Sequence, residues 1–296
     1  MEKRVSRMAL LLTALLACAP WGAMSTDVPH TSLIAFISAR DGNREVYVMH
    51  SNGSGQTRLT QSTGDEDSPT WSPDGSRIAF MSRDGFDWDL WVMNVNGEGQ
   101  EALLATSYGE WECAWSPDGR HVAISTNRGG DSEIYLVSTS DGSLTQLTDN
   151  SGAIDGLPAW SPDGTSIAFF SSRDGNWEIY RMNADGSEQV RLTSHSSNDY
   201  APTWSPDGSQ IAFVSGRDGN EEIYVMRADG TDLRRLTDHP GADTAPTWSP
   251  DGTRIAFSSG RSGRGDIYVM DAEGGNLLQL TDNPSADTSP AWCPIP

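Results

Sequence analysis

The sequence predicts an all-β fold, a six-bladed β-propeller with four antiparallel strands in each blade. The motif Trp-Ser-Pro-Asp-Gly occurs five times, and a sixth tryptophan continues the series; the tryptophans are Trp71, Trp115, Trp160, Trp204, Trp248 and Trp292. Their steps of 44, 45, 44, 44 and 44 residues indicate one supersecondary unit that is repeated. Each unit contains four short apolar runs bounded by Gly, Pro, Asp or Asn, which is typical of strands joined by tight turns.

One repeat illustrates the four strands. After Trp248, residues 249–252 read Ser-Pro-Asp-Gly, and residues 254–257, 266–270 and 277–281 are the apolar runs that follow. Proline presets φ at the second position of a type I turn, and glycine relieves strain at its end. Asn-Gly or Asp-Gly stands between the last two runs of most repeats, which is the strongest short hairpin pattern. No helical periodicity is visible after residue 30, so four antiparallel strands in a radial array are expected.

The phase of the repeat gives the number of blades and the way the ring closes. The second strand recurs six times, at Ile34, Ile78, Val122, Ile167, Ile211 and Ile255. The first copy lacks a preceding Trp-Ser-Pro-Asp-Gly, whereas residues 290–292 are left over after the last copy. The C-terminal strand is therefore expected to complete the blade built from residues 33–60, which removes two open sheet edges. The alternative is an open array of six units with a free tail.

Composition restricts the possible partners. The chain has 20 Lys and Arg against 41 Asp and Glu, a net charge of −21, which argues against nucleic acid, because its binders need basic patches. The acidity suits basic partners or divalent cations, or serves solubility alone. Residues 33–293 are enough for one propeller, and a monomer is expected. Cys113 and Cys293 fall on non-adjacent blades, so both are expected to be free, buried thiols.

The first 25 residues do not belong to the repeat. A basic start is followed by about ten apolar residues, which is too short for a permanent membrane span and is typical of a secretory signal peptide. Residues 15–18 read Leu-Leu-Ala-Cys and resemble the bacterial lipobox, which makes Cys18 a candidate for lipidation. The alternative is ordinary cleavage near residues 23–25. Both predict export, to the periplasm or to a lipid anchor in the cell envelope.

The repeat resembles that of a known family. Residues 160–193 and 204–237 read Trp-Ser-Pro-Asp-Gly, Ile-Ala-Phe, Arg-Asp-Gly-Asn, Glu-Ile-Tyr and Arg-Leu-Thr in order, and so resemble the WD-like propeller repeat of the TolB family. The resemblance covers residues 33–293. It implies a non-enzymatic component of an envelope complex, whose propeller binds a peptidoglycan-associated lipoprotein. TolB also carries an α/β domain before its propeller, and too few residues precede the first repeat here to form one. We therefore expect a stand-alone envelope propeller.

One acidic residue recurs five residues before each tryptophan, in the loop that leads from one blade to the next. The six positions are Glu66, Glu110, Asp155, Asp199, Asp243 and Asp287. Sixfold geometry would place these carboxylates near the mouth of the channel, where they could bind a Ca²⁺ ion or a basic peptide group. In the structural alternative, each acid accepts hydrogen bonds from the backbone of its own loop.

An arginine and an acid recur across the next short turn. The pairs are Arg40 with Glu45, Arg83 with Asp89, Arg128 with Glu133, Arg173 with Glu178, Arg217 with Glu222 and Arg261 with Asp266. Opposite charges that flank a hairpin are expected to pair with each other. The functional alternative is a ring of arginines that faces an anionic partner.

Departures from the repeat concentrate on one side of the ring. The loops of the second repeat contain Phe86, Trp88, Tyr108 and Trp111, and Tyr200 takes the slot of Trp111 two repeats later. Exposed aromatic residues bury large areas at low entropic cost, so they suit contact with a protein or a carbohydrate. Alternatively they cover the ends of neighbouring blades.

Catalytic patterns are missing from the sequence. The five histidines have no metal-binding spacing with the cysteines, and no Gly-x-Ser-x-Gly is present. The sequence therefore predicts a binding protein that is not an enzyme and needs no cofactor. The enzyme alternative is a Ca²⁺-dependent hydrolase or lyase that uses the ring of acids.

Overall fold

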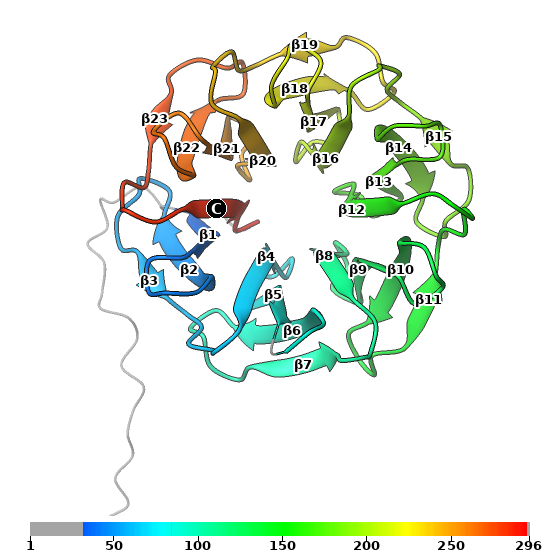
Figure 1. The fold of residues 1–296 in the computed structure, drawn as a ribbon, viewed down its shortest axis with the longest axis horizontal. Coiled ribbons are helices and arrows are strands. Elements are labelled where there is room, and N and C mark those ends of the chain that lie inside the picture. Colours follow the sequence, from blue (N-terminus) through cyan, green and yellow to red (C-terminus); the bar gives the residue numbers. More distant parts are fainter. Residues whose placement is uncertain (1–31, 84, 295–296) are drawn as a thin grey trace, which may run out of the picture. The chain divides into compact units, whose positions relative to one another are not determined.

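The computed structural model describes residues 32–83 and 85–294, which form 24 strands in six four-stranded sheets. The sheets are arranged around a central axis, with the first strand of each blade innermost and the fourth at the circumference (Figure 1). The predicted six-bladed propeller is thus confirmed. The signal peptide and the lipidation candidate Cys18 lie outside the described residues.

The first three blades are built from the N-terminal half of the sequence and, in blade 1, from its last strand. Blade 1 contains β24 (Asp287–Trp292), β1 (Leu33–Ser38), β2 (Glu45–His50) and β3 (Thr57–Arg58). Blade 2 contains β4 (Asp65–Trp71), β5 (Arg77–Arg83), β6 (Asp89–Asn94) and β7 (Glu101–Leu104). Blade 3 contains β8 (Glu110–Trp115), β9 (His121–Thr126), β10 (Glu133–Ser138) and β11 (Leu144–Gln146).

The other three blades repeat the same order. Blade 4 contains β12 (Asp155–Trp160), β13 (Ser166–Ser171), β14 (Glu178–Asn183) and β15 (Val190–Arg191). Blade 5 contains β16 (Asp199–Trp204), β17 (Gln210–Ser215), β18 (Glu222–Arg227) and β19 (Arg234–Arg235). Blade 6 contains β20 (Asp243–Trp248), β21 (Arg254–Ser259), β22 (Asp266–Asp271) and β23 (Leu278–Gln279).

The ring closes through β24, which pairs antiparallel with β1. Ile34 is opposite Trp292 and Ala35 is opposite Ala291, and the amide of Cys293 donates to the carbonyl of Leu33 at 2.8 Å. The last strand of the sequence thus supplies the inner strand of blade 1, as the sequence predicted. The alternative of an open array is wrong.

Neighbouring blades pack face to face through the apolar second and third strands. One cluster joins Ile223 of blade 5 to Trp248, Ile255 and Phe257 of blade 6. The phenylalanines of the repeated Ile-Ala-Phe are buried in five blades, at Phe36, Phe80, Phe169, Phe213 and Phe257. Burial of such a side chain stabilises the fold by about 1.5–3 kcal/mol. Because each cluster draws on two sheets, no blade has a complete core of its own.

The Ser-Pro-Asp-Gly segments form the predicted turns, and each turn also contacts the next one around the ring. In the first copy the amide of Gly75 donates to the carbonyl of Ser72 at 2.8 Å, which is the bond of a β-turn. Gly252 has φ +69°, and a Cβ there would lie 3.2 Å from the ring of Pro206 in the preceding blade. Glycine is therefore needed both for its backbone angle and for the packing between turns.

Every inner strand contains a bulge that the sequence pattern did not predict. The register between inner and second strand shifts in all six blades. At each bulge one residue that is not glycine has a positive φ of 42° to 53°; these residues are Ser68, Glu112, Leu157, Ala201, Ala245 and Ser289. A β-bulge bends its strand and re-aims the neighbouring side chains, so the six bulges set the shape of the channel wall.

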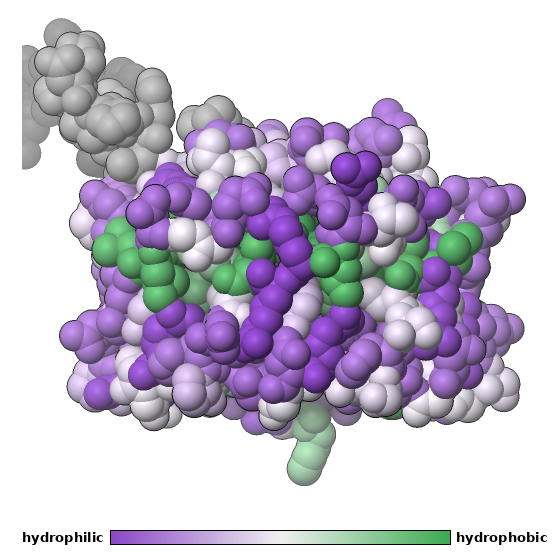
Figure 2. Space-filling view, turned by 90° about the horizontal axis from the view of Figure 1, so that it is seen from above, coloured by the Kyte–Doolittle hydropathy of each residue, from purple (hydrophilic) through white to green (hydrophobic). Residues whose placement is uncertain are grey.

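On one side of the rim, apolar residues gather at mid-height, with hydrophilic residues between, above and below them (Figure 2). The exposed apolar residues of the rim flank or belong to the outer strands, with Val190 46%, Leu233 43% and Leu278 52% exposed. These outer strands are short, and β15 and β19 contain the arginines Arg191 and Arg234. Short, charged edge strands resist pairing with other chains.

Candidate functional site

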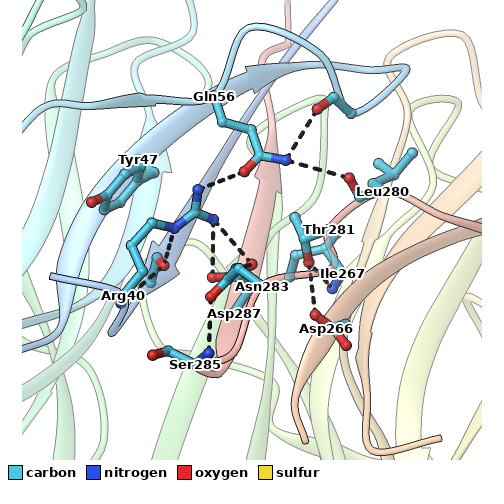
Figure 3. A network of polar contacts seen from close by, with 12 residues as sticks. Arg40, Tyr47, Gln56, Asp266, Ile267, Leu280, Thr281, Asn283, Ser285 and Asp287 are labelled. Carbon is cyan, nitrogen blue, oxygen red and sulfur yellow. Dashed lines mark hydrogen bonds and ion pairs between the residues drawn. The ribbon is translucent and has the colours of Figure 1, made fainter. Parts of the chain in front are cut away.

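The acids near the start of the inner strands bind arginines in most blades, and Figure 3 shows the arrangement between blades 6 and 1. Arg40 Nη2 lies 3.1 Å from Asp287 Oδ2, and Asp287 is fully buried. Nε of Arg40 donates to Ser38 Oγ at 2.7 Å, and Nη1 donates to Gln56 Oε1 at 2.6 Å. The guanidinium also lies 4.7 Å from the ring centroid of Tyr47. Arginine is suited to this role because its planar fork can bind several partners while it stacks on an aromatic ring.

The same ion pair recurs in blades 4, 5 and 6. The distances from Nη2 to Oδ2 are 3.0 Å for Arg173 with Asp155, 2.8 Å for Arg217 with Asp199 and 2.8 Å for Arg261 with Asp243. All three aspartates are fully buried. A buried charge persists only when it is paired and hydrogen-bonded, so these carboxylates are held inside the fold by their arginines. In these blades the ring of acids is a set of buried ion pairs and does not line an open mouth.

The predicted pairing of each arginine with the acid across its hairpin is wrong. Arg173 binds Asp155, and Glu178, its predicted partner, binds Arg191 at 2.8 Å. The physical reason is the register of the inner strand: Asp155 is opposite Ser171, and the arginine two residues beyond that serine lies on the same side of the sheet. The hairpin acid faces the outer strand instead, where the arginine of the Arg-Leu-Thr segment meets it.

Blade 2 departs from this pattern because its arginine is displaced by one residue. Arg83 follows Ser82 directly, whereas the other paired arginines stand two residues after the equivalent serine. Successive residues of a strand point to opposite faces, so the guanidinium cannot take the usual position. It lies 3.0 Å from Asp65 instead. Glu66, the residue at the ring position, is 1% exposed and forms no ion pair with an arginine among the described residues.

Glu66 therefore lies in a site that favours its neutral form. Ser62 Oγ donates to it at 2.6 Å and Ser82 Oγ at 3.2 Å. Burial, and then the neighbouring carboxyl group of Glu45 in blade 1, raises the pKa of Glu66 to about 8. Two carboxyl groups that share a buried site retain a proton, because two adjacent negative charges repel each other. This junction between blades is therefore able to change its charge near neutral pH.

Blade 3 is the second exception. Glu110 is 1% exposed and accepts a hydrogen bond of 2.6 Å from Thr106, and its other oxygen has no partner among the described residues. Arg128 has the expected register, yet its guanidinium lies 5.9 Å from the rings of both Tyr108 and Tyr135. Burial, and to a lesser extent the nearby Asp89, raises the pKa of Glu110 to about 7. A glutamate in place of aspartate thus coincides with the loss of the ion pair in both exceptional blades.

The predicted aromatic patch lies beside these two exceptional sites. Phe86 is fully exposed, and Tyr108 is 42% exposed. Trp88 is half-buried between two guanidinium groups, with Arg44 at 5.2 Å and Arg83 at 5.1 Å from its ring. Phe86, Trp88, Tyr108 and Trp111 belong to blades 2 and 3 and the loop between them, and Arg44 reaches Trp88 from blade 1. The loops of blades 2 and 3 therefore present exposed aromatic side chains beside a tryptophan ring that stacks on two guanidinium groups.

Two of the predicted aromatic residues have a structural role. Trp111 is half-buried and packs on Gly109, where an added Cβ would lie 2.5 Å from its ring. Tyr200 meets Trp177 edge to face at 5.7 Å and donates to Glu221 at 2.5 Å. Tyr200 thus covers the junction of blades 4 and 5, which is the alternative that the sequence left open. Phe86 and Tyr108 remain the accessible members of the patch.

A cavity at the turn end of the channel was not predicted as a site. It measures about 600 Å³ and is lined by the six repeat tryptophans together with Pro73, Pro117, Pro162, Pro206, Pro250 and Pro294. Trp71 and Trp204 donate from Nε1 to the carbonyls of Ala291 and Ala159, at 3.0 and 3.1 Å. The tryptophan series itself was the available signal, since residues at one repeat position must meet around the axis.

Cys113 and Cys293 do not form a disulfide with each other, as the sequence predicted. Cys293 is buried, and half-buried Cys113 donates from Sγ to the carbonyl of Ser68 at 3.1 Å. Residues 32–83 and 85–294 contain no group of three or more His, Cys, Asp or Glu side chains placed to hold a metal ion. No helix in the same part of the chain has the length and hydrophobicity that crossing a bilayer demands.

These features define a class of protein: a closed six-bladed propeller held together by buried ion pairs, with irregular loops on one side. The chain matches the family described as TolB beta propeller domain over residues 23–112, 90–200 and 192–295. It belongs to that family.

Individual relatives agree with this assignment. The chain is similar to the Tol-Pal system protein TolB of Geobacter sulfurreducens, with 52% identity over 40 residues, which is 14% of this chain and 9% of that protein. Among solved structures it is similar to putative TolB from Agrobacterium tumefaciens, with a TM-score of 0.70 and 28% identity, over 86% of this chain and 90% of that one. TolB from Acinetobacter baumannii shares the fold, with a TM-score of 0.80 and 23% identity, over 90% of this chain and 68% of that one.

Proposed function

We propose that this propeller is a non-enzymatic scaffold of the bacterial cell envelope that binds a protein through the loops of blades 2 and 3. Membership of a family that includes Tol-Pal components supports a protein-binding role at a coarse level. The observation that carries the choice of surface is Phe86, a fully exposed phenylalanine in the loop that leads to Trp88, whose carbonyl accepts a hydrogen bond from the amide of Glu110 at 3.0 Å. Exposed aromatic residues of this kind are enriched among the residues that dominate binding energy.

The enzyme alternative finds less support in the ring of acids. A Ca²⁺-dependent hydrolase or lyase would need several accessible carboxylates at one place. Four of the six acids are fully buried and bound to arginines. The two remaining glutamates lie in different blades, and burial raises the pKa of each. The arrangement favours a rigid display of loops over metal-assisted chemistry.

Photocrosslinking in cells tests the binding surface. A photoreactive amino acid at position 86 or 108 is expected to give a discrete adduct with one envelope protein. Positions 190 and 233 are matched controls, because Val190 and Leu233 are about as exposed as Tyr108 but lie on the outer rim. Loss of that adduct in Phe86→Ser, with unchanged thermal stability, would support the proposal. Equal adducts from the rim positions would contradict it.

The location in the envelope is proposed from the leader. We infer export followed by lipidation at Cys18, on the basis of the Leu-Leu-Ala-Cys segment. Mass spectrometry of the mature N-terminus tests this directly: a diacylglyceryl group on Cys18 is expected, and Cys18→Ser is expected to leave the protein unprocessed or free in the periplasm. An unmodified N-terminus beginning near residues 24–26 would instead indicate ordinary signal cleavage.

A further inference from the structure

We propose that the tryptophan-lined mouth is a second binding site, on the face opposite the blade 2 and 3 loops, for an extended basic peptide that contains proline. The first argument is the cavity. Its volume of about 600 Å³ lies in the range of ligand sites, and its wall alternates aromatic and proline rings with Thr70, Thr203 and Thr247. Aromatic-lined grooves are the surfaces that bind proline-rich segments, because such segments are already extended and lose little entropy.

The second argument is the charge around this mouth. Five exposed aspartates stand in the Ser-Pro-Asp-Gly turns, at Asp74, Asp118, Asp163, Asp207 and Asp251. None of the five forms an ion pair with a described residue. The hydroxyl of the turn serine, and then a backbone amide, lower the pKa of Asp163 and Asp207, so both remain ionised at neutral pH. An apolar cavity with an anionic margin is complementary to a peptide that is apolar in its centre and basic at its ends.

Smaller hollows between the turns extend the acidic margin. One hollow of about 320 Å³ is lined by Trp115, Asp74 and Asp118 together with Arg77, and another of about 320 Å³ by Trp160, Asp118 and Asp163 together with His121. An indole and two carboxylates in one lining suit a lysine or arginine side chain, because the cation gains from both the ring face and the negative charges. These hollows give the basic residues of the peptide a place beside the central cavity.

The protein itself shows a cation on an indole at this mouth. The guanidinium of Arg254 lies 5.2 Å from the ring centroid of Trp292. Among the described residues, the other five tryptophans of the mouth have no such cation over their rings. A basic side chain of the peptide would take the role on the remaining rings that Arg254 takes on Trp292.

Titration of intrinsic tryptophan fluorescence tests the site with synthetic peptides. Acetyl-Lys-Pro-Leu-Pro-Lys-amide is expected to change the emission saturably, and to bind several-fold more weakly when salt rises from 50 to 300 mM. Acetyl-Glu-Pro-Leu-Pro-Glu-amide is expected not to bind. Spermidine is the second control ligand, because it carries positive charge but lacks the apolar centre of the peptide. Equal affinity for spermidine and the lysine peptide would overturn the proposal, as would equal affinity for the two peptides.

A matched pair of triple variants locates the peptide. Replacement of Asp118, Asp163 and Asp207 by asparagine removes three charges at the mouth but keeps the Oδ1 acceptors that bind Ser116, Ser161 and Ser205 at 2.6 Å. The control replaces Asp141, Asp185 and Asp229, which stand in the outer hairpin turns of the same three blades and bind their own turns through Oδ1 in the same way.

The first variant is expected to weaken the lysine peptide at least fivefold, and the control less than twofold, with equal melting temperatures. Equal weakening by the two variants would overturn the site.

A benzophenone in place of the leucine separates this site from the proposed function. Its adducts are expected on Trp115, Trp160 and Trp204, and they are assigned to single residues by fragmentation, because one tryptic peptide spans residues 84–120. Adducts on residues 85–111 would show that the peptide binds the blade 2 and 3 loops, and the inference would then be wrong while the proposed function stood.

Discussion

Arg83 lies 3.0 Å from Asp65, on the side of the strand opposite to the one that its counterparts in four other blades use. The cause is one missing residue between Ser82 and Arg83, since the other paired arginines follow the equivalent serine at a distance of two. The loss of a single residue thus removes a buried ion pair, leaves Glu66 without an arginine, and frees Arg83 to stack on Trp88 at 5.1 Å.

Restoring the register is expected to restore the ion pair. An alanine inserted between Ser82 and Arg83, together with Glu66→Asp, places the arginine and the ring acid as in blade 5, where the pair is 2.8 Å apart. The free energy of unfolding at pH 8 should rise by about 1 kcal/mol, because an unpaired buried acid gains a partner. Urea denaturation measures it. The control inserts alanine between Gly85 and Phe86, which leaves the register unchanged. A rise in the free energy of unfolding of the control, or no rise in that of the test variant, would contradict this explanation.

Glu66→Gln is expected to change how stability depends on pH. Burial raises the pKa of Glu66 from 4.5 to about 8, so the folded state retains a proton that the unfolded chain releases above pH 4.5. The stability linked to this proton is complete below pH 4.5 and is lost as pH rises through about 8. Glutamine mimics the protonated acid and cannot titrate. The free energy of unfolding of the variant should therefore increasingly exceed that of the wild type between pH 5 and 9, with about 1.4 kcal/mol for each unit of pKa shift.

Thermal or urea unfolding at pH 5, 7 and 9 measures this difference. Glu98→Gln is the control, because it makes the same substitution in an exposed hairpin turn of the same blade. A difference between Glu66→Gln and wild type that stays constant over this pH range would refute a raised pKa at this site.

Asp199→Asn is expected to be strongly destabilising. Asp199 is fully buried and pairs with Arg217, whose side chain is only 14% exposed, so the substitution leaves a largely buried guanidinium without its counter-charge. The loss should be about 2–4 kcal/mol at pH 7. Asp232→Asn removes the partner of Arg227 in a pair whose side chains are 71% and 65% exposed, and should cost less than about 1 kcal/mol. Chemical denaturation of the two variants compares them, and similar losses would contradict the buried-pair explanation.

Gly186→Ala and Gly175→Ala separate backbone strain from contact between blades. Both glycines have positive φ, +86° and +105°, but an added Cβ meets the carbonyl oxygen of Leu147 at 2.5 Å only at Gly186. Gly175 has nothing within 4 Å of the same position. Gly175→Ala should cost about 1–2 kcal/mol from strain alone, and Gly186→Ala more, because the neighbouring blade must shift. The melting temperatures of the two variants measure this difference. An equal fall in both variants would show that the contact with Leu147 is unimportant.

The sequence predicted the blades, the turns and the closing strand because each depends on a period or a local pattern. The ion pairs escaped it because they depend on register: Arg217 and Asp199 are 18 residues apart, and only the pairing of Asp199 with Ser215 brings them together. Once the inner strand is aligned with the second, the serine and the arginine two residues later identify the partner. Hairpin proximity alone favoured Glu222, which binds Arg235 instead.

The bulges and the tryptophan mouth were missed for different reasons. Nothing in residues such as Ala201 or Leu157 favours a positive φ, so their conformation is imposed by the tertiary structure. The tryptophans were interpreted as markers of the repeat, and the cavity that they share appears only when the sheets are placed around an axis. The sequence identified Phe86 as a departure from the repeat. It could not predict that Phe86 is fully exposed, because the exposure depends on the conformation of its loop.

The pairing of Ile34 with Trp292 has a kinetic consequence. These residues are separated by nearly the whole sequence, so loop-closure entropy opposes their contact more than any other in the ring, and blade 1 should be the last to mature. Until then β1 offers a free ladder of amides and carbonyls, to which the final strand of another molecule could add. At high concentration, refolding should therefore yield some dimers that exchange their last strands, and dilution before refolding should suppress them.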